Sequence, residues 1–294
     1  MTTISYWLSS ALAVVATIVA AATLLLPGLF RDPAVWVGSA QGTAIVILTL
    51  GVPSLVLGMI LSSRGSARGA IVWLGALGYL FYNGVIFSFG VAFNALFLGM
   101  VAMLSLSVWS VVAVLVRLDP RDVRDQFADR LPVRTIAGYQ LLVAAGFGFL
   151  WLSGILPALG SGTRPPFLEG TELLTNPIHV LDLGFTLPVT ITGAIWLLRR
   201  RAWGYVVSGV MLVGLFIETV SIAFDQYFGA LADPNTTVAS FTMVPVFVVL
   251  AVLALVPTIV YLIAMTGAPT SVVRAAVPAG TSSSPTPSPR TSRP

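Results

Sequence analysis

Residues 176–201, NPIHVLDLGFTLPVTITGAIWLLRRR, contain the features that decide the fold. The Asn-Pro pair is typical of a helix N-cap followed by the first helical residue. About 20 mostly apolar residues follow, which is the length that crosses roughly 30 Å of hydrocarbon. Three arginines end the segment, and arginine marks the cytoplasmic side of a membrane. This stretch therefore predicts a membrane-spanning helix that runs from the outer to the inner surface.

The rest of the chain repeats this construction. Of its 294 residues, 57% are hydrophobic and only 9% are charged, whereas a soluble domain carries about 25% charged residues. This composition excludes a soluble protein and predicts an all-α, polytopic transmembrane helix bundle in a lipid bilayer. We expect about eight spans, near residues 7–30, 41–62, 70–89, 91–116, 135–157, 177–198, 203–224 and 241–264.

Missing residue types exclude several classes of function. The chain has no cysteine and no lysine, so thiolate metal sites, a Schiff-base lysine and the lysine of a phosphate-binding loop are all excluded. One histidine cannot form a bis-His haem or a multi-His zinc centre within one chain. The net charge of +4 is small and gives no reason to expect a nucleic-acid partner. No cofactor or oligomeric state is predicted.

The arginines predict the topology. If both termini are cytoplasmic, 13 of the 15 arginines lie on the inner side, and only Arg31 and Arg164 lie outside. No arginine precedes the first apolar run and no cleavage site follows it, so we expect no cleaved signal peptide.

A connector at residues 117–134 separates the first four spans from the last four. Asp119-Pro120 is typical of a helix start. Apolar residues then recur at every fourth position, at Val123, Phe127 and Leu131. This spacing predicts a short amphipathic helix on the inner surface, and the alternative is a solvated connector.

An internal repeat links the two halves at an offset of 135 residues. The matching pairs are Pro53 and Pro188, Gly58 and Gly193, Arg64 and Arg199, and Gly69 and Gly204. We therefore expect two parallel four-helix repeats, residues 1–116 and 135–266, related by an axis along the membrane normal. Residues 267–294 are rich in Ser, Thr, Pro and Gly and predict a disordered cytoplasmic tail.

Polar residues in the spans converge at one depth in the outer half of the bundle. At 1.5 Å per residue, Asp182 lies roughly 8 Å and Glu218 about 10 Å from the outer ends of their helices, and Asn83 falls at a similar depth. His179 lies three residues before Asp182, on the same helix face. The candidate ligand-binding or proton-coupling residues are Asp182, Glu218, His179, Asn83, Asn94 and Asp225.

Structural roles compete with this interpretation. Asn83 and Asn94 could hydrogen-bond between helices, and His179 could bond a loop carbonyl. Asp182 and Glu218 are harder to explain, because an ionisable group within a span costs roughly 2.5–3.5 kcal/mol and no arginine lies at their depth. They are either protonated, share a proton, or meet a cation or His179.

Three strings resemble a family of uncharacterised bacterial multi-pass membrane proteins. They are Phe93-Asn-Ala-Leu-Phe97, Asn176-Pro-Ile-His-Val-Leu-Asp182 and Arg199-Arg-Arg-Ala-Trp203-Gly-Tyr205. The resemblance implies an integral protein of the bacterial plasma membrane and assigns no activity.

Three functions remain open. The first is binding or transport of a small ligand or ion through the polar site. The second is a metal-dependent membrane enzyme that uses His179, Asp182, Glu218 and Asp225 as ligands. The third is a sensor or assembly partner without chemistry, with glycines such as Gly75 and Gly209 at helix contacts.

Overall fold

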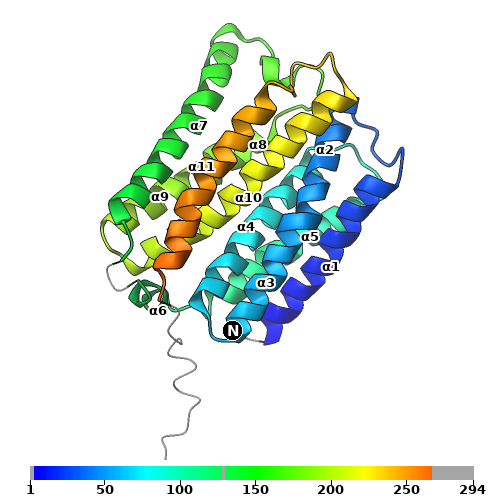
Figure 1. Cartoon of the computed structure of the whole chain (residues 1–294). Helices are drawn as coiled ribbons and strands as arrows, with labels where there is room; N and C mark the ends of the chain where they lie inside the picture. Colours follow the sequence, from blue (N-terminus) through cyan, green and yellow to red (C-terminus); the bar gives the residue numbers. More distant parts are fainter. Residues whose placement is uncertain (1–2, 128–129, 267–294) are drawn as a thin grey trace, which may run out of the picture.

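The structure is a computed structural model that describes residues 3–127 and 130–266. Eight helical segments within these ranges are long and apolar enough to cross a membrane, and Figure 1 shows them packed side by side. They are α1 (Thr3–Leu25), α2 (Ala34–Val46) continued by η1 (Ile47–Gly51) and α3 (Val52–Ser63), α4 (Ala67–Phe89), α5 (Phe97–Leu115), α7 (Val133–Ser161), α8 (Pro177–Leu181) continued by η3 (Asp182–Thr186) and α9 (Leu187–Leu198), α10 (Ala202–Ala232) and α11 (Met243–Ala264). The predicted all-α polytopic bundle is confirmed.

The first described residues, the connector and the end of α11 lie at the same end of the bundle (Figure 1). This placement is what an even number of spans requires. The side of the membrane that this end faces stays a prediction. The predicted disordered tail lies outside the described residues.

Helices α4 and α10 lie at the centre of the bundle. α4 has the largest buried share of the eight spans, 67%, and α10 packs against α2, α4, α9 and α11. Two glycines of α2 allow its close contact with α10, because a Cβ atom at Gly38 or Gly42 would lie within 3.0 Å of the α10 backbone near Phe228 or Phe224. Polar side chains on α4 and α10 can therefore be shielded from lipid by the helices around them.

Several helix ends differ from the prediction. α10 continues to Ala232 instead of ending near residue 224, and α5 begins at Phe97 instead of residue 91. Asp225 therefore lies within α10, not at its end. Glu218 is 14 residues from that end, or about 21 Å along the axis, so the expected distance of about 10 Å from the helix end is wrong. The hydropathy of the sequence falls at Asp225, but the helix continues past it. The Asp225 carboxylate accepts a hydrogen bond from the Thr43 hydroxyl of α2 at 2.8 Å.

Both halves contain a π-helical turn directly before the proline that interrupts a span. In η1 the Val52 N–H donates to the Ile47 carbonyl, and in η3 the Leu187 N–H donates to the Asp182 carbonyl. The wider turn accommodates a proline that lacks an N–H and would clash with the carbonyl four residues earlier. These two turns are 135 residues apart, the offset of the sequence repeat.

Other local features recur at this offset. α3 and α9 both have 12 residues, and α4 and α10 begin at Ala67 and Ala202. A Cβ atom at Gly42 would meet the backbone at Asp225, and one at Gly90 would meet Pro177, which is the corresponding pair. These matches favour the proposed duplication, while the superposition of the complete halves stays a prediction.

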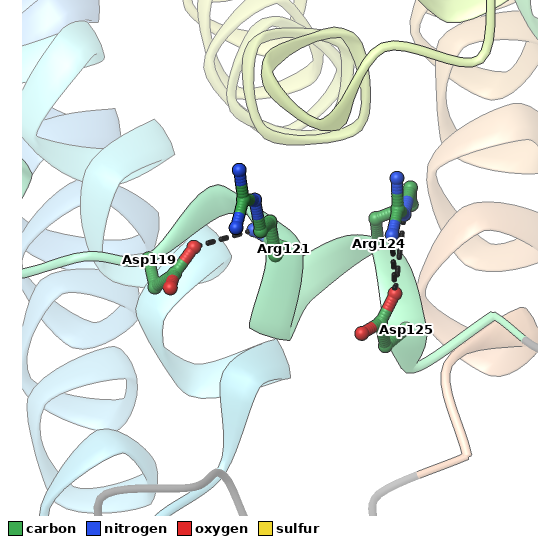
Figure 2. Close-up of polar contacts among 4 residues, drawn as sticks. All are labelled: Asp119, Arg121, Arg124 and Asp125. Carbon is green, nitrogen blue, oxygen red and sulfur yellow. Dashed lines mark hydrogen bonds and ion pairs between the residues drawn. The ribbon is translucent and has the colours of Figure 1, made fainter.

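The connector forms the short helix α6, Pro120–Asp125. The Asp119 side chain accepts a hydrogen bond from the Arg121 N–H at 2.8 Å, and Arg124 forms an ion pair with Asp125 at 3.1 Å (Figure 2). The charged side chains thus occupy the outer face of the connector, as the fourfold spacing predicts.

The apolar face of the connector packs against protein, not against lipid. Val123, Phe127 and Leu131 are all buried in the hydrophobic core. The Phe127 ring lies 5.1 Å from the ring of Tyr205 in α10 and 5.0 Å from that of Tyr261 in α11. The connector therefore closes one end of the bundle.

Candidate functional site

A hydrogen bond between the two central helices forms the middle of the candidate site. Asn83 of α4 donates from Nδ2 to Oε2 of Glu218 in α10 at 2.9 Å. One turn away, the hydroxyl groups of Tyr79 and Ser221 lie 3.4 Å apart. The polar side chains of α4 and α10 therefore face each other inside the bundle.

Asp182 is held by neutral donors. It is the first residue of η3 and is only 8% exposed. Its carboxylate accepts hydrogen bonds from Trp151 Nε1 of α7 at 2.9 Å and from the Tyr82 hydroxyl of α4 at 3.1 Å. Tyr82 precedes Asn83 in the chain, so α4 supplies adjacent donors to the carboxylates of two different helices.

Asp225 extends this arrangement toward α2. Its carboxylate accepts the Thr43 hydroxyl, and its backbone carbonyl accepts the Ser39 hydroxyl at 3.2 Å. Asp182, Glu218 and Asp225 thus accept hydrogen bonds from α4, α7 and α2. We call these three carboxylate side chains the carboxylate row. The row crosses the bundle from η3, past α4, to the contact between α10 and α2.

No cation neutralises the row within the described residues. The ion pair found among the described residues joins Arg124 to Asp125. It lies in the connector, at the end of the bundle where α1 begins (Figure 1). All side-chain donors to the three carboxylates described above are uncharged. An ionised carboxylate in such a place lacks the paired charge that a buried ion needs.

His179 lies at the edge of the row. Its ring centre is 4.3 Å from that of Trp151 and 4.2 Å from that of Phe167, which belongs to the loop after α7. The side chain is 6% exposed, and its buried Nδ1 atom has no hydrogen-bond partner. The residue before α8, Asn176, caps this helix by accepting the Ile178 N–H at 2.9 Å, so it has the structural role.

The Asn94 side chain forms its hydrogen bonds within its own turn. Its Nδ2 donates to the Ala92 carbonyl and its Oδ1 accepts the Leu96 N–H at 2.8 Å. Both ends of the amide are used within one turn before α5. Asn94 therefore does not open the span, because α5 begins three residues later. Its part in the candidate site stays a prediction.

The geometry does not support a metal site made of His179, Asp182, Glu218 and Asp225. Among the described residues, no three His, Cys, Asp or Glu side chains are placed to hold one metal ion. The row spreads its carboxylates over η3 and two positions of α10, and each has a different donor. A common coordination sphere does not form.

Three residues of the site were not identified from the sequence: Trp151, Tyr82 and Thr43. A signal existed for Trp151, because a buried indole N–H usually finds an acceptor. The sequence could not show which acceptor it meets, since Trp151 and Asp182 come from different helices.

Comparisons with protein-family models, curated proteins and solved structures find no match to this chain. The resemblance to a bacterial membrane family is therefore not confirmed, and the site is interpreted from its own geometry.

Proposed function

We propose that this membrane-spanning bundle binds and transports a proton or small cation through the carboxylate row. The observation that carries the proposal is the pairing of Glu218 with the Asn83 amide instead of a basic side chain. An arginine would hold the carboxylate in its charged form. An amide N–H can donate to a carboxyl group that is charged or protonated, so Glu218 can change its state without losing this bond.

The other members of the row have the same property. Asp182 accepts from a phenol and an indole, and Asp225 accepts from a hydroxyl. None of these donors fixes the charge of its carboxylate. Ionisable residues inside a membrane bundle commonly mark ion pathways and proton relays, and three such residues in one row fit this use.

The π-helical turn at Asp182 supplies a place where the span could bend. π-helical turns within α-helices occur frequently at functional sites. Here the turn begins at a carboxylate of the row and ends one residue before Leu187-Pro188. A change in bend would move Asp182 relative to its donors on α4 and α7, which is the kind of motion that alternating access needs.

We further propose that the row lies in the outer half of a bacterial plasma membrane, with both termini cytoplasmic. Asn83 is six residues before the end of α4, or about 9 Å along the helix axis. The parallel repeats predicted from the sequence belong to the same proposal. They would place Asn83 and Glu218 at equivalent positions of the two halves.

Reconstitution into liposomes tests the proposed transport. We expect the protein to increase the flux of protons, sodium or potassium, measured with entrapped fluorescent indicators under a membrane potential. Glu218→Gln should abolish this flux, because a glutamine cannot exchange a proton or balance a cation. Asp125→Asn is the matched control, since Asp125 is exposed in the connector.

Flux equal to that of empty liposomes for all three ions would reject the proposal. Unchanged flux through Glu218→Gln would also reject it. Equal losses in Glu218→Gln and Asp125→Asn would show that the effect does not come from the row.

A further inference from the structure

A pocket of about 510 Å³ lies beneath the loop between α7 and α8. Its walls come from the last turns of α7, the loop itself, and the first turns of α8 and η3. The lining is mainly apolar and includes Ile155, Ala158, Leu159, Phe167, Val180 and Leu183. The pocket also contains His179, which brings an ionisable ring nitrogen into this apolar surface.

His179 is not satisfied by the protein around it. Its Nδ1 atom is fully buried without a hydrogen-bond partner, and the whole side chain is 6% exposed. Leaving a buried polar atom unpaired is unfavourable. Trp151 and Phe167 contact the ring through their aromatic faces and edges and supply no bond to it. A hydrogen-bonding group in the pocket would remove this penalty when the His179 ring turns to bring this nitrogen to the pocket surface.

The loop over the pocket is held in place by its own contacts. Arg164 donates from Nη2 to the carbonyls of Leu168 at 3.0 Å and Leu173 at 2.8 Å. Phe167 extends from this loop onto the His179 ring. Arg164 therefore stabilises the loop that covers the pocket, and its guanidinium group donates to carbonyls of this loop.

The open side of the pocket is continuous with the apolar outside of the bundle. Leu159 of α7 is 73% exposed and Val180 of α8 is 58% exposed. Both lie near the end of a membrane-spanning helix, where such side chains face lipid. A molecule that enters here comes from the membrane, and the apolar walls favour a neutral one with a hydrocarbon body.

We propose that this pocket binds a neutral, lipid-dissolved amphiphile with its hydroxyl or carbonyl head group hydrogen-bonded to His179 and its chain against α7 and α8. The head group then lies beside Trp151, which also bonds Asp182. The pocket is separate from the transport proposed above. It could be occupied in a protein that transports no ion.

Photolabelling in lipid nanodiscs tests the pocket. The probe is hexadecanol with a diazirine in mid-chain, and its partner probe is hexadecane with the same diazirine and no hydroxyl. We expect the alcohol to label residues 155–183 saturably, as mapped by mass spectrometry. His179→Phe keeps the aromatic packing and removes the nitrogen. It should weaken binding of the alcohol about fivefold, which corresponds to one hydrogen bond of about 1 kcal/mol.

The alkane provides the control for simple lipid exposure. Its labelling should not change in His179→Phe. Ala158→Phe should block the alcohol by filling the pocket, and Ser10→Phe should not, because Ser10 lines a different groove between α1 and α3. Chromatography and thermal unfolding of each variant show whether it is folded. The His179→Phe result decides if Ala158→Phe does not fold.

Three results would overturn the proposal. The alcohol could label residues 155–183 no more than it labels the groove at Ser10. It could label them equally in wild type and His179→Phe. The alkane could compete for the same labelling as well as the alcohol does, which would show a lipid-facing crevice with only water at His179.

Discussion

The carboxylates of the row accept hydrogen bonds from uncharged neighbours. These bonds therefore do not require the carboxyl groups to be ionised. Glu218 accepts one bond from Asn83, and Asp182 accepts bonds from Trp151 and Tyr82. Glutamine at position 218 can still accept the bond from Asn83 through its oxygen. The two donors to Asp182 bond different carboxylate oxygens, so asparagine there would accept from Trp151 through its oxygen and donate to the Tyr82 hydroxyl through its NH2 group. Substitutions of these carboxyl groups by amides therefore distinguish a structural role from a functional one.

Asp182→Asn and Glu218→Gln should change the free energy of unfolding by less than about 1 kcal/mol, because each amide can keep a hydrogen bond with every neighbour named above. Asn83→Leu removes the donor to Glu218 and should destabilise the protein by about 1–3 kcal/mol. Thermal unfolding in detergent measures all three. If the two amide variants lose as much stability as Asn83→Leu, the row is structural.

Asp32 should make the stability depend on pH. It lies in the loop between α1 and α2 and accepts the Ala92 N–H at 2.7 Å. Burial raises the pKa of this carboxyl group, the bond from Ala92 opposes the shift, and the charge of Glu172 adds to it. The folded protein therefore retains this proton at a pH where the unfolded chain has lost it. Stability should fall as pH rises from the ordinary Asp range to the folded-state pKa.

Asp32→Asn should flatten this part of the pH profile, because asparagine still accepts the Ala92 N–H and does not titrate. The melting temperature of wild type and variant is measured at a series of pH values. Asp233→Asn is the control, since Asp233 accepts a backbone N–H in another loop. Parallel profiles for wild type and Asp32→Asn would contradict the assignment.

Among the helices, the contact between α2 and α10 depends on small residues. A Cβ atom at Gly42 would lie 2.6–2.8 Å from backbone atoms of Phe224 and Asp225. The same contact positions Thr43 to donate to Asp225. The spacing of these two helices therefore determines the α2 end of the carboxylate row.

Gly42→Ala should destabilise the protein by about 1–3 kcal/mol, because α2 and α10 would have to separate. Gly78→Ala is a matched control, since a Cβ atom at Gly78 in α4 meets no atom within 4 Å. It should be neutral or gain up to about 1 kcal/mol through helix propensity. Thermal unfolding measures both, and equal losses would show that close packing is not the cause.

For the whole molecule, the even number of spans places both ends of the described chain at one end of the bundle (Figure 1). The arginine distribution predicts that this end is cytoplasmic. Reporter fusions at Thr163 and Pro234 should therefore score as external, and fusions in the connector should score as cytoplasmic. Cytoplasmic scores at both Thr163 and Pro234 would invert the topology and place the carboxylate row in the inner half.

The sequence by itself determined the architecture. Apolar runs of membrane length and the lack of charge predict eight spans, because lipid accepts only backbone groups that are bonded within a helix or closed barrel. The prolines and glycines at an offset of 135 residues also mark where both halves form π-helical turns. These features depend on residues that are close together in the chain, so the sequence alone predicts them.

The tertiary structure alone decided which polar side chains meet. The sequence indicates that Asn83, Asp182 and Glu218 are unusual in their spans, but the partners Trp151, Tyr82 and Thr43 lie on other helices. It also places Asn94 in its own turn and His179 in a pocket under a loop. The rotation of each helix about its axis and the close helix contacts at glycines determine which side chains touch. Both depend on packing between segments that are distant in the chain.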